Sequence, residues 1–158
     1  QNKLPIVGPE NENYWAFGDS YNKGAWALHT LRHVINNDTL WWKTLKSFTQ
    51  QHAKSNVNTQ DFISHVEDKT KLNLDYFFEQ YFFDKRIPTL EYFQQGDKLH
   101  YRWTDTVSGF TMPINVEING LEKRLFPNNE EQIESIDQYS VVHFKDWQFL
   151  YNKKIIQM

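Results

Sequence analysis

The spacing of hydrophobic residues changes along the chain near Pro88. Before Pro88, hydrophobic positions recur every three or four residues, which is the period of an amphipathic helix. The pattern predicts four helices, with hydrophobic faces at Tyr21, Gly24, Leu28, Leu31 and Ile35; at Trp41, Leu45, Phe48 and His52; at Phe62, Ile63 and Val66; and at Leu74, Phe77, Phe78, Tyr81 and Phe82. Residues 1–20 are rich in Asn, Gly and Pro and are predicted to form a loop.

Polar residues indicate where these helices begin and end. The run Asn36-Asn37-Asp38 interrupts the hydrophobic pattern with residues that favour caps, so the first helix is predicted to end there. Asn58, with Asp61 three residues later, resembles a capping box and predicts the start of the third helix. Asn73 is the candidate cap of the fourth helix.

Beyond Pro88 the hydrophobic period falls to two, which is typical of strands. Strands are predicted at LHYRW (99–103), INVEI (114–118), SVVHF (140–144) and WQFLY (147–151), and Asn119-Gly120 is predicted to form a turn before LEKRLF (121–126). Short strands separated by turn residues are typical of an antiparallel β-sandwich. The predicted fold class is therefore α+β, with an N-terminal helical bundle over residues 1–86 and a small antiparallel β-sandwich domain over 87–158. Because so short a sandwich can bury only a small core, we expect it to pack against the helices.

The composition excludes several classes of protein. The 158 residues carry a net charge of −3, and 39% are hydrophobic, which is typical of a soluble globular protein. No apolar run is long enough to cross a bilayer, and no basic cluster indicates nucleic-acid binding. The chain has no cysteine, which excludes disulfides and thiolate metal sites but identifies no compartment.

The stretch HTLRH places His29 and His33 four residues apart, so that on a helix both face one side and could bind one metal ion. His52 follows at a spacing where many zinc peptidases have their third ligand. However, the position of the general base in the H-E-x-x-H motif is Thr30, which cannot take a proton near neutral pH. Arg32 would also place a cation beside a bound dication. We therefore interpret these histidines as ordinary surface or interfacial residues, with a three-histidine zinc site as the alternative that metal analysis would test.

The stretch GPENEN (8–13) suggests a second motif. Some aminopeptidases bind the substrate amine through the Glu of a Gly-x-Met-Glu-Asn strand. Here the Met is missing, the spacing between Gly8 and Glu10 is one residue short, and no strand pattern surrounds them. A polar loop is the better interpretation.

The segment SYNKGAWALHTLR (20–32) closely resembles zinc aminopeptidases of the aminopeptidase N and leukotriene A hydrolase type. The resemblance continues in order along nearly the whole chain, through TLWWKTLKSF (39–48), NVNTQDFISHVE (56–67), LDYFFEQYFFDKRIPTLEY (74–92) and the strand PINVEI (113–118). Tyr81 stands where the family usually has Trp. No single motif is decisive, and the ordered series carries the resemblance.

The resemblance implies that residues 1–86 are the helical end of a thermolysin-like metallopeptidase catalytic domain, and that a β-sandwich follows it. It also implies a catalytic role for Tyr21, the Tyr of the family's Tyr-x-Lys-Gly motif. A phenol is a hydrogen-bond donor at neutral pH, so it can stabilise the negative charge that develops on the scissile carbonyl oxygen. In the family order, HTLRH lies on the helix after this Tyr and does not bind zinc.

We therefore expect a C-terminal fragment of a zinc aminopeptidase that removes N-terminal residues from peptides. The zinc ligands and the Glu base would lie N-terminal to Gln1, so the fragment alone would hold no zinc and would be inactive. Its partners would be the peptide substrate of the parent enzyme and the missing N-terminal portion of the same protein. The alternative is a non-catalytic binding or scaffolding module that uses its β-sandwich to engage a partner.

Overall fold

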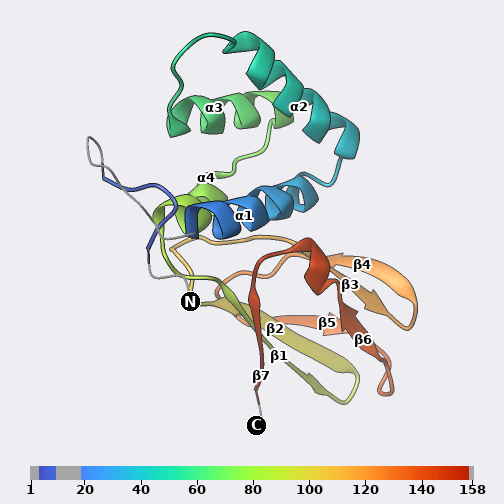
Figure 1. Cartoon of the computed structure of the whole chain (residues 1–158). Coiled ribbons are helices and arrows are strands. Elements are labelled where there is room, and N and C mark those ends of the chain that lie inside the picture. Colours follow the sequence, from blue (N-terminus) through green and yellow to red (C-terminus); the bar gives the residue numbers. More distant parts are fainter. Residues whose placement is uncertain (1–3, 10–18, 157–158) are drawn as a thin grey trace.

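The computed structural model describes residues 4–9 and 19–156, and in it the helices come first and the strands follow (Figure 1). The helices are α1 (Asp19–Ile35), α2 (Asp38–Gln51), α3 (Thr59–Thr70) and α4 (Asp75–Phe78), and α4 continues as the π-helix η1 (Glu79–Phe83). The strands are β1 (Thr89–Gln95), β2 (Lys98–Thr104), β3 (Ile114–Ile118), β4 (Leu121–Leu125), β5 (Gln132–Ser135), β6 (Val142–Phe144) and β7 (Asn152–Ile155), with the 3₁₀-helix η2 (Asp146–Gln148) between β6 and β7. The predicted α+β fold class is confirmed.

The predicted end of the first helix and the predicted start of the third are both found. Asn36 has a left-handed backbone just after α1, and the side chain of Asn37 caps α2 by accepting a hydrogen bond from the Leu40 amide at 2.9 Å. The capping box at the start of α3 is complete. The Asp61 amide donates to the Asn58 side chain, and the Asn58 amide donates to the Asp61 carboxylate, each at 2.9 Å.

The fourth helix differs from the prediction in its geometry. It starts at Asp75, so Leu74 holds the N-cap position, and the Asn73 side chain instead accepts a hydrogen bond from the Asp75 amide at 3.1 Å. After one α-helical turn the backbone widens into η1. There three consecutive side chains, those of Gln80, Tyr81 and Phe82, are buried. The wider π-helical turn is a local feature that hydrophobic spacing does not reveal.

The strands form two sheets, with orders β5-β2-β1-β7 and β4-β3-β6. The strands β2 and β3 contain the predicted LHYRW and INVEI segments, and β6 lies within SVVHF. Asn119 and Gly120 both have positive φ, as a two-residue type I′ hairpin turn requires. One pairing departs from the antiparallel prediction, because β7 returns from the end of the chain and pairs in parallel with β1.

The predicted strand WQFLY (147–151) is wrong. Its first residues form η2, and β7 begins only at Asn152. The backbone of Leu150 explains the difference, because both of its polar groups bind helix side chains instead of a neighbouring strand. Its amide donates to Thr30 Oγ1 at 2.8 Å, and its carbonyl accepts from the Tyr81 hydroxyl at 2.5 Å.

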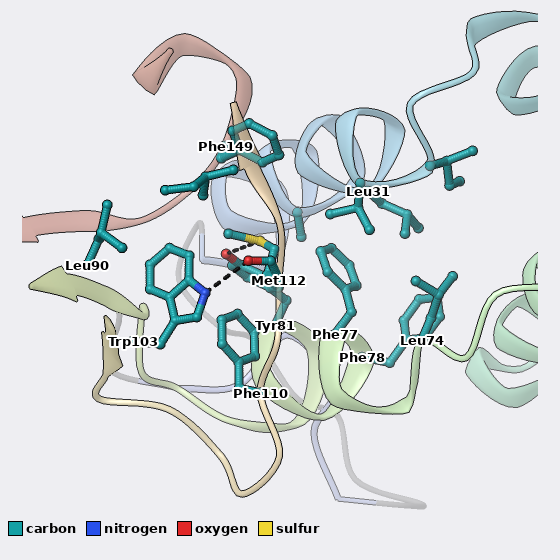
Figure 2. Packing of buried hydrophobic residues seen from close by; sticks show 14 of the residues in the cluster. Leu31, Leu74, Phe77, Phe78, Tyr81, Leu90, Trp103, Phe110, Met112 and Phe149 are labelled. Carbon is teal, nitrogen blue, oxygen red and sulfur yellow. Dashed lines mark hydrogen bonds between the residues drawn. The ribbon is translucent and has the colours of Figure 1, made fainter. Parts of the chain in front are cut away.

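One continuous hydrophobic core joins the helices to the sheets, as Figure 2 shows. Its largest fully buried side chains come from both halves: Leu31, Leu74, Phe77, Phe78, Tyr81, Leu90, Leu99, Trp103, Phe110, Met112, Ile114 and Leu125. Trp103 also donates its indole N–H to the Met112 carbonyl at 2.9 Å, which satisfies the polar atom of a buried ring. The β half therefore packs against the helices, while the division into separate domains 1–86 and 87–158 stays a prediction.

A helix that spans a membrane requires a certain length and hydrophobicity. No helix in the described ranges is both long enough and apolar enough to cross a membrane.

Candidate functional site

Tyr21 lies in the first turn of α1, and its side chain is 78% exposed. The buried face of α1 follows the helical period with Lys23, Ala27, Thr30, Leu31, Val34 and Ile35. Because Tyr21 lies off this face, its ring is not part of the core packing. The Tyr21 hydroxyl therefore lies at the surface, at the N-terminal end of a helix whose opposite face is packed in the core.

Lys23 fixes that end of the helix. Its side chain is 2% exposed, and its Nζ donates to the Asp84 carbonyl at 2.6 Å. Asp84 directly follows η1, and its carboxylate forms an ion pair with Arg86 at 2.6 Å. The first turn of α1 is therefore held to the end of a helix some sixty residues later in the sequence. This contact restricts where the neighbouring Tyr21 can lie.

The exposed side of the first two turns of α1, here called the Tyr21 face, consists of Tyr21, Asn22, Ala25 and Trp26. Trp26 is 44% exposed, and its ring meets the His29 ring edge to face at 5.6 Å between centroids. A Cβ added at Gly24 would meet nothing within 4 Å. The described part of the chain thus leaves this face open.

The structure brings two of the three candidate histidines together and separates the third. The rings of His29 and His33 are 4.7 Å apart, and both contact the segment after β6, where His29 Nε2 bonds the Trp147 carbonyl at 3.0 Å. His52 instead caps the end of α2 and packs against Phe48, with a ring-centroid distance of 4.7 Å. Among the described residues no group of three His, Cys, Asp or Glu side chains is arranged to hold a metal ion.

The environment of His33 disfavours its charged form. Burial is the main cause, and the neighbouring His29 and Arg32 add to it, which together lower the pKa of His33 to about 4. The Nε2 atom is buried and has no hydrogen-bond partner among the described residues. His33 is therefore a neutral ring packed between α1 and the rings of Trp147 and Phe149.

The other two residues of HTLRH that bear on the metal hypothesis also make structural contacts. Thr30 is fully buried and accepts the Leu150 amide hydrogen bond. Arg32 forms an ion pair with Asp38 at 2.6 Å and lies over the Trp42 ring. HTLRH thus connects α1 to α2 and to the segment around η2.

One sequence interpretation stays untested, and one structurally important residue was not identified from the sequence. Most of GPENEN (8–13) lies outside the described residues, so the structure says nothing of Glu10. The anchoring role of Lys23 was missed, because a lysine in an amphipathic pattern is expected at the surface. The one available signal was its position, since Lys23 falls on the helix face shared by Ala27 and Leu31.

Comparisons with known proteins show which family and which fold this chain resembles. Residues 7–81 match the family model of the peptidase family M1 domain. No curated protein sequence matches the chain. The fold is similar to that of Legionella pneumophila aminopeptidase A, solved in complex with aspartic acid, with a TM-score of 0.72 and 16% sequence identity. That similarity covers 90% of this chain but only 19% of the Legionella chain. Residues 7–81 of this chain are therefore similar to a peptidase family M1 domain, and the chain has the fold of part of an aminopeptidase.

Proposed function

We propose that this chain is part of a zinc-dependent aminopeptidase that hydrolyses N-terminal residues from peptides, and that Tyr21 is a catalytic residue of that enzyme. The described residues do not supply a zinc site. In this proposal the metal ligands and the Glu general base belong to sequence outside the chain. The chain by itself is then inactive. It contributes the Tyr21 hydroxyl to an active site whose other groups come from the rest of the enzyme.

The chemistry assigned to Tyr21 requires an exposed hydroxyl on a rigid support. When a peptide bond is attacked, negative charge develops on its carbonyl oxygen, and a fixed donor lowers the barrier only if it already points at that oxygen. The observation that carries the proposal is that Tyr21 is 78% exposed while Lys23, two residues later, is buried and bonded to Asp84. The match to the peptidase family over residues 7–81 supports the same role.

The test is Tyr21→Phe in the full-length enzyme. Removing one donor to a developing oxyanion lowers turnover about 10²–10³-fold. Because the substrate carbonyl carries little charge in the ground state, we expect kcat to fall by this amount while KM changes little. Steady-state kinetics on an aminoacyl substrate measure both constants.

The matched control is Tyr139→Phe, which removes an equally exposed hydroxyl from the loop between β5 and β6. It should leave kcat unchanged. An unchanged kcat in Tyr21→Phe, or equal losses in kcat and in substrate affinity, would remove Tyr21 from the mechanism.

A separate observation tests the enzyme assignment against a binding or scaffolding module. The reading frame upstream of this chain should encode H-E-x-x-H, followed by a Glu that supplies the last zinc ligand. If these residues are absent, the parent protein has the fold of the family without its chemistry, and the binding module becomes the better account.

A further inference from the structure

A cavity separate from the Tyr21 face lies at the opposite end of α1. Its volume is about 360 Å³, and it is lined by the last turn of α1, the segment that leads into α4, the segment before β3 and the end of β4. Its walls include the apolar side chains of Ile35, Leu72 and Phe126, and no acidic residue lines it. Leu72 is 40% exposed and Phe126 63% exposed, so the apolar wall opens to the surface.

Arg124 provides a positive charge in this cavity. Its Nη2 donates to the carbonyls of His33 at 3.1 Å and Val34 at 2.7 Å, and its Nη1 donates to the Asn115 side chain at 3.0 Å. All three acceptors are neutral. A guanidinium has five N–H groups, so these three bonds leave two without a partner among the described residues.

The charge of Arg124 is only partly balanced. The carbonyls at the C-terminal end of α1 carry partial negative charge, which favours a cation there. Within the described ranges, however, Arg124 forms no ion pair with a carboxylate, and burial lowers its pKa from the ordinary value. A half-buried cation with two unused donors and no anionic partner favours the entry of an anion.

Tyr76 adds a second donor to the same cavity. Its hydroxyl makes no hydrogen bond to any described residue, although the ring is largely buried and packs edge to face against Phe110. Burial raises the pKa of Tyr76 to about 12, so the phenol keeps its proton at neutral pH. Tyr76 and Arg124 line the same cavity, and the positive charge of Arg124 acts against this rise in the pKa of Tyr76.

We propose that this cavity binds a carboxylate attached to a small apolar group. Arg124 and Tyr76 would donate hydrogen bonds to the carboxylate, and the apolar wall would contact the apolar group of the ligand. The carboxylate is either that of a free acid or the C-terminal carboxylate of a peptide. Planar guanidinium groups bind carboxylates well, and the volume suits a ligand of about the size of one amino-acid residue. The site is at the other end of α1 from Tyr21, so the proposal does not depend on the proposed function.

Calorimetric titration of the purified 158-residue chain tests the proposal with N-acetyl-leucine as the free acid. The matched probe is N-acetyl-leucine amide, which has the same apolar side chain but no charge. We expect the acid to bind and the amide to bind at least tenfold more weakly, because a hydrogen bond to a charged group contributes about 1.5–3 kcal/mol. A short peptide that ends in leucine, with a free or an amidated C-terminus, then separates the two sources of the carboxylate.

Two variants locate the binding without disturbing α1. Tyr76→Phe removes only a hydroxyl that has no hydrogen-bond partner among the described residues, and it should weaken binding of the acid about tenfold. Leu72→Glu places a negative charge at the open wall and should abolish binding. Tyr139→Phe is the control and should change nothing. Equal binding of acid and amide, no binding up to about 10 mM, or full binding by both cavity variants would overturn the proposal.

Discussion

Polar side chains on the buried face of α1 are each held by a distant part of the chain. Lys23 binds the backbone at Asp84, Thr30 binds Leu150, and His33 packs against Trp147 and Phe149. A buried polar group without a partner costs about 1–3 kcal/mol, so the two hydrogen bonds fix α1 in one orientation. Both Tyr21 and the Arg124 cavity depend on that orientation.

At the residue scale, His33 makes stability depend on pH. Its pKa is about 4 in the folded chain and about 6.5 in an unfolded chain, so the unfolded chain binds the extra proton between these values. Stability from His33 is therefore complete above about pH 6.5 and is lost as the pH falls toward 4. We expect the urea midpoint to fall between pH 7 and pH 4.5, and His33→Gln to reduce that fall.

The matched control for this effect is His143→Gln, because His143 is an exposed histidine in β6. It should keep the full pH dependence of the original chain. If His33→Gln also keeps it, another group causes the loss of stability in acid.

At the residue scale, Thr30 allows a second prediction. Thr30→Val keeps the shape of the side chain but leaves the Leu150 amide without its acceptor. We expect a loss of about 1–3 kcal/mol in the free energy of unfolding, measured by urea denaturation. Thr49→Val is the control, because Thr49 lies on the exposed side of α2 and bonds only the carbonyl of Lys46 in its own helix. Equal effects of the two substitutions would contradict the assigned role of Thr30.

At the scale of elements, local sequence explains where most helices begin. The capping box of α3 needs only Asn58 and Asp61, which are three residues apart, so the sequence was sufficient to predict it. By contrast, η1 depends on tertiary contacts, because its buried residues meet α1, the segment between β2 and β3 and the segment at Leu150. The predicted strand at 147–151 failed for the same reason.

The cap of α3 provides the prediction at this scale. Asn58→Ala removes the side chain that accepts the Asp61 amide, and it should lower the free energy of unfolding by about 1 kcal/mol. Chemical denaturation measures the loss. Asn56→Ala, at an exposed position in the loop before α3, should have no effect. Equal changes in both variants would mean that the cap contributes little to this helix.

At the scale of the whole molecule, the helical half and the β half share one core and also share the backbone of Leu150. Thr30 binds its amide and Tyr81 binds its carbonyl, so two helices hold the same peptide segment. Such a connection makes it hard for either half to unfold without disturbing the other. We therefore predict that the boundary between 86 and 87 marks a change of secondary structure within one cooperative unit.

Native-state amide exchange tests this cooperativity. In Thr30→Val the protection of amides in α1 and in β1 should fall by the same free energy, because both belong to the unit that opens globally. A fall confined to α1 would show that the two halves unfold separately and would support the domain division at 86. Combining Thr30→Val with Tyr81→Phe should give a loss that is not the sum of the two, since the two residues share one partner.

The sequence by itself determined the fold class, the first three helices, the hairpin at Asn119-Gly120 and the resemblance that singled out Tyr21. These features depend on the hydrophobic period and on residues a few positions apart, and both can be seen directly in the order of residues. Only the tertiary structure decided that Lys23 is buried against Asp84, that His52 lies apart from His29 and His33, and that Arg124 and Tyr76 line one cavity. Each of these facts joins residues that are distant in sequence, and such pairs are brought together by packing, which local spacing does not encode.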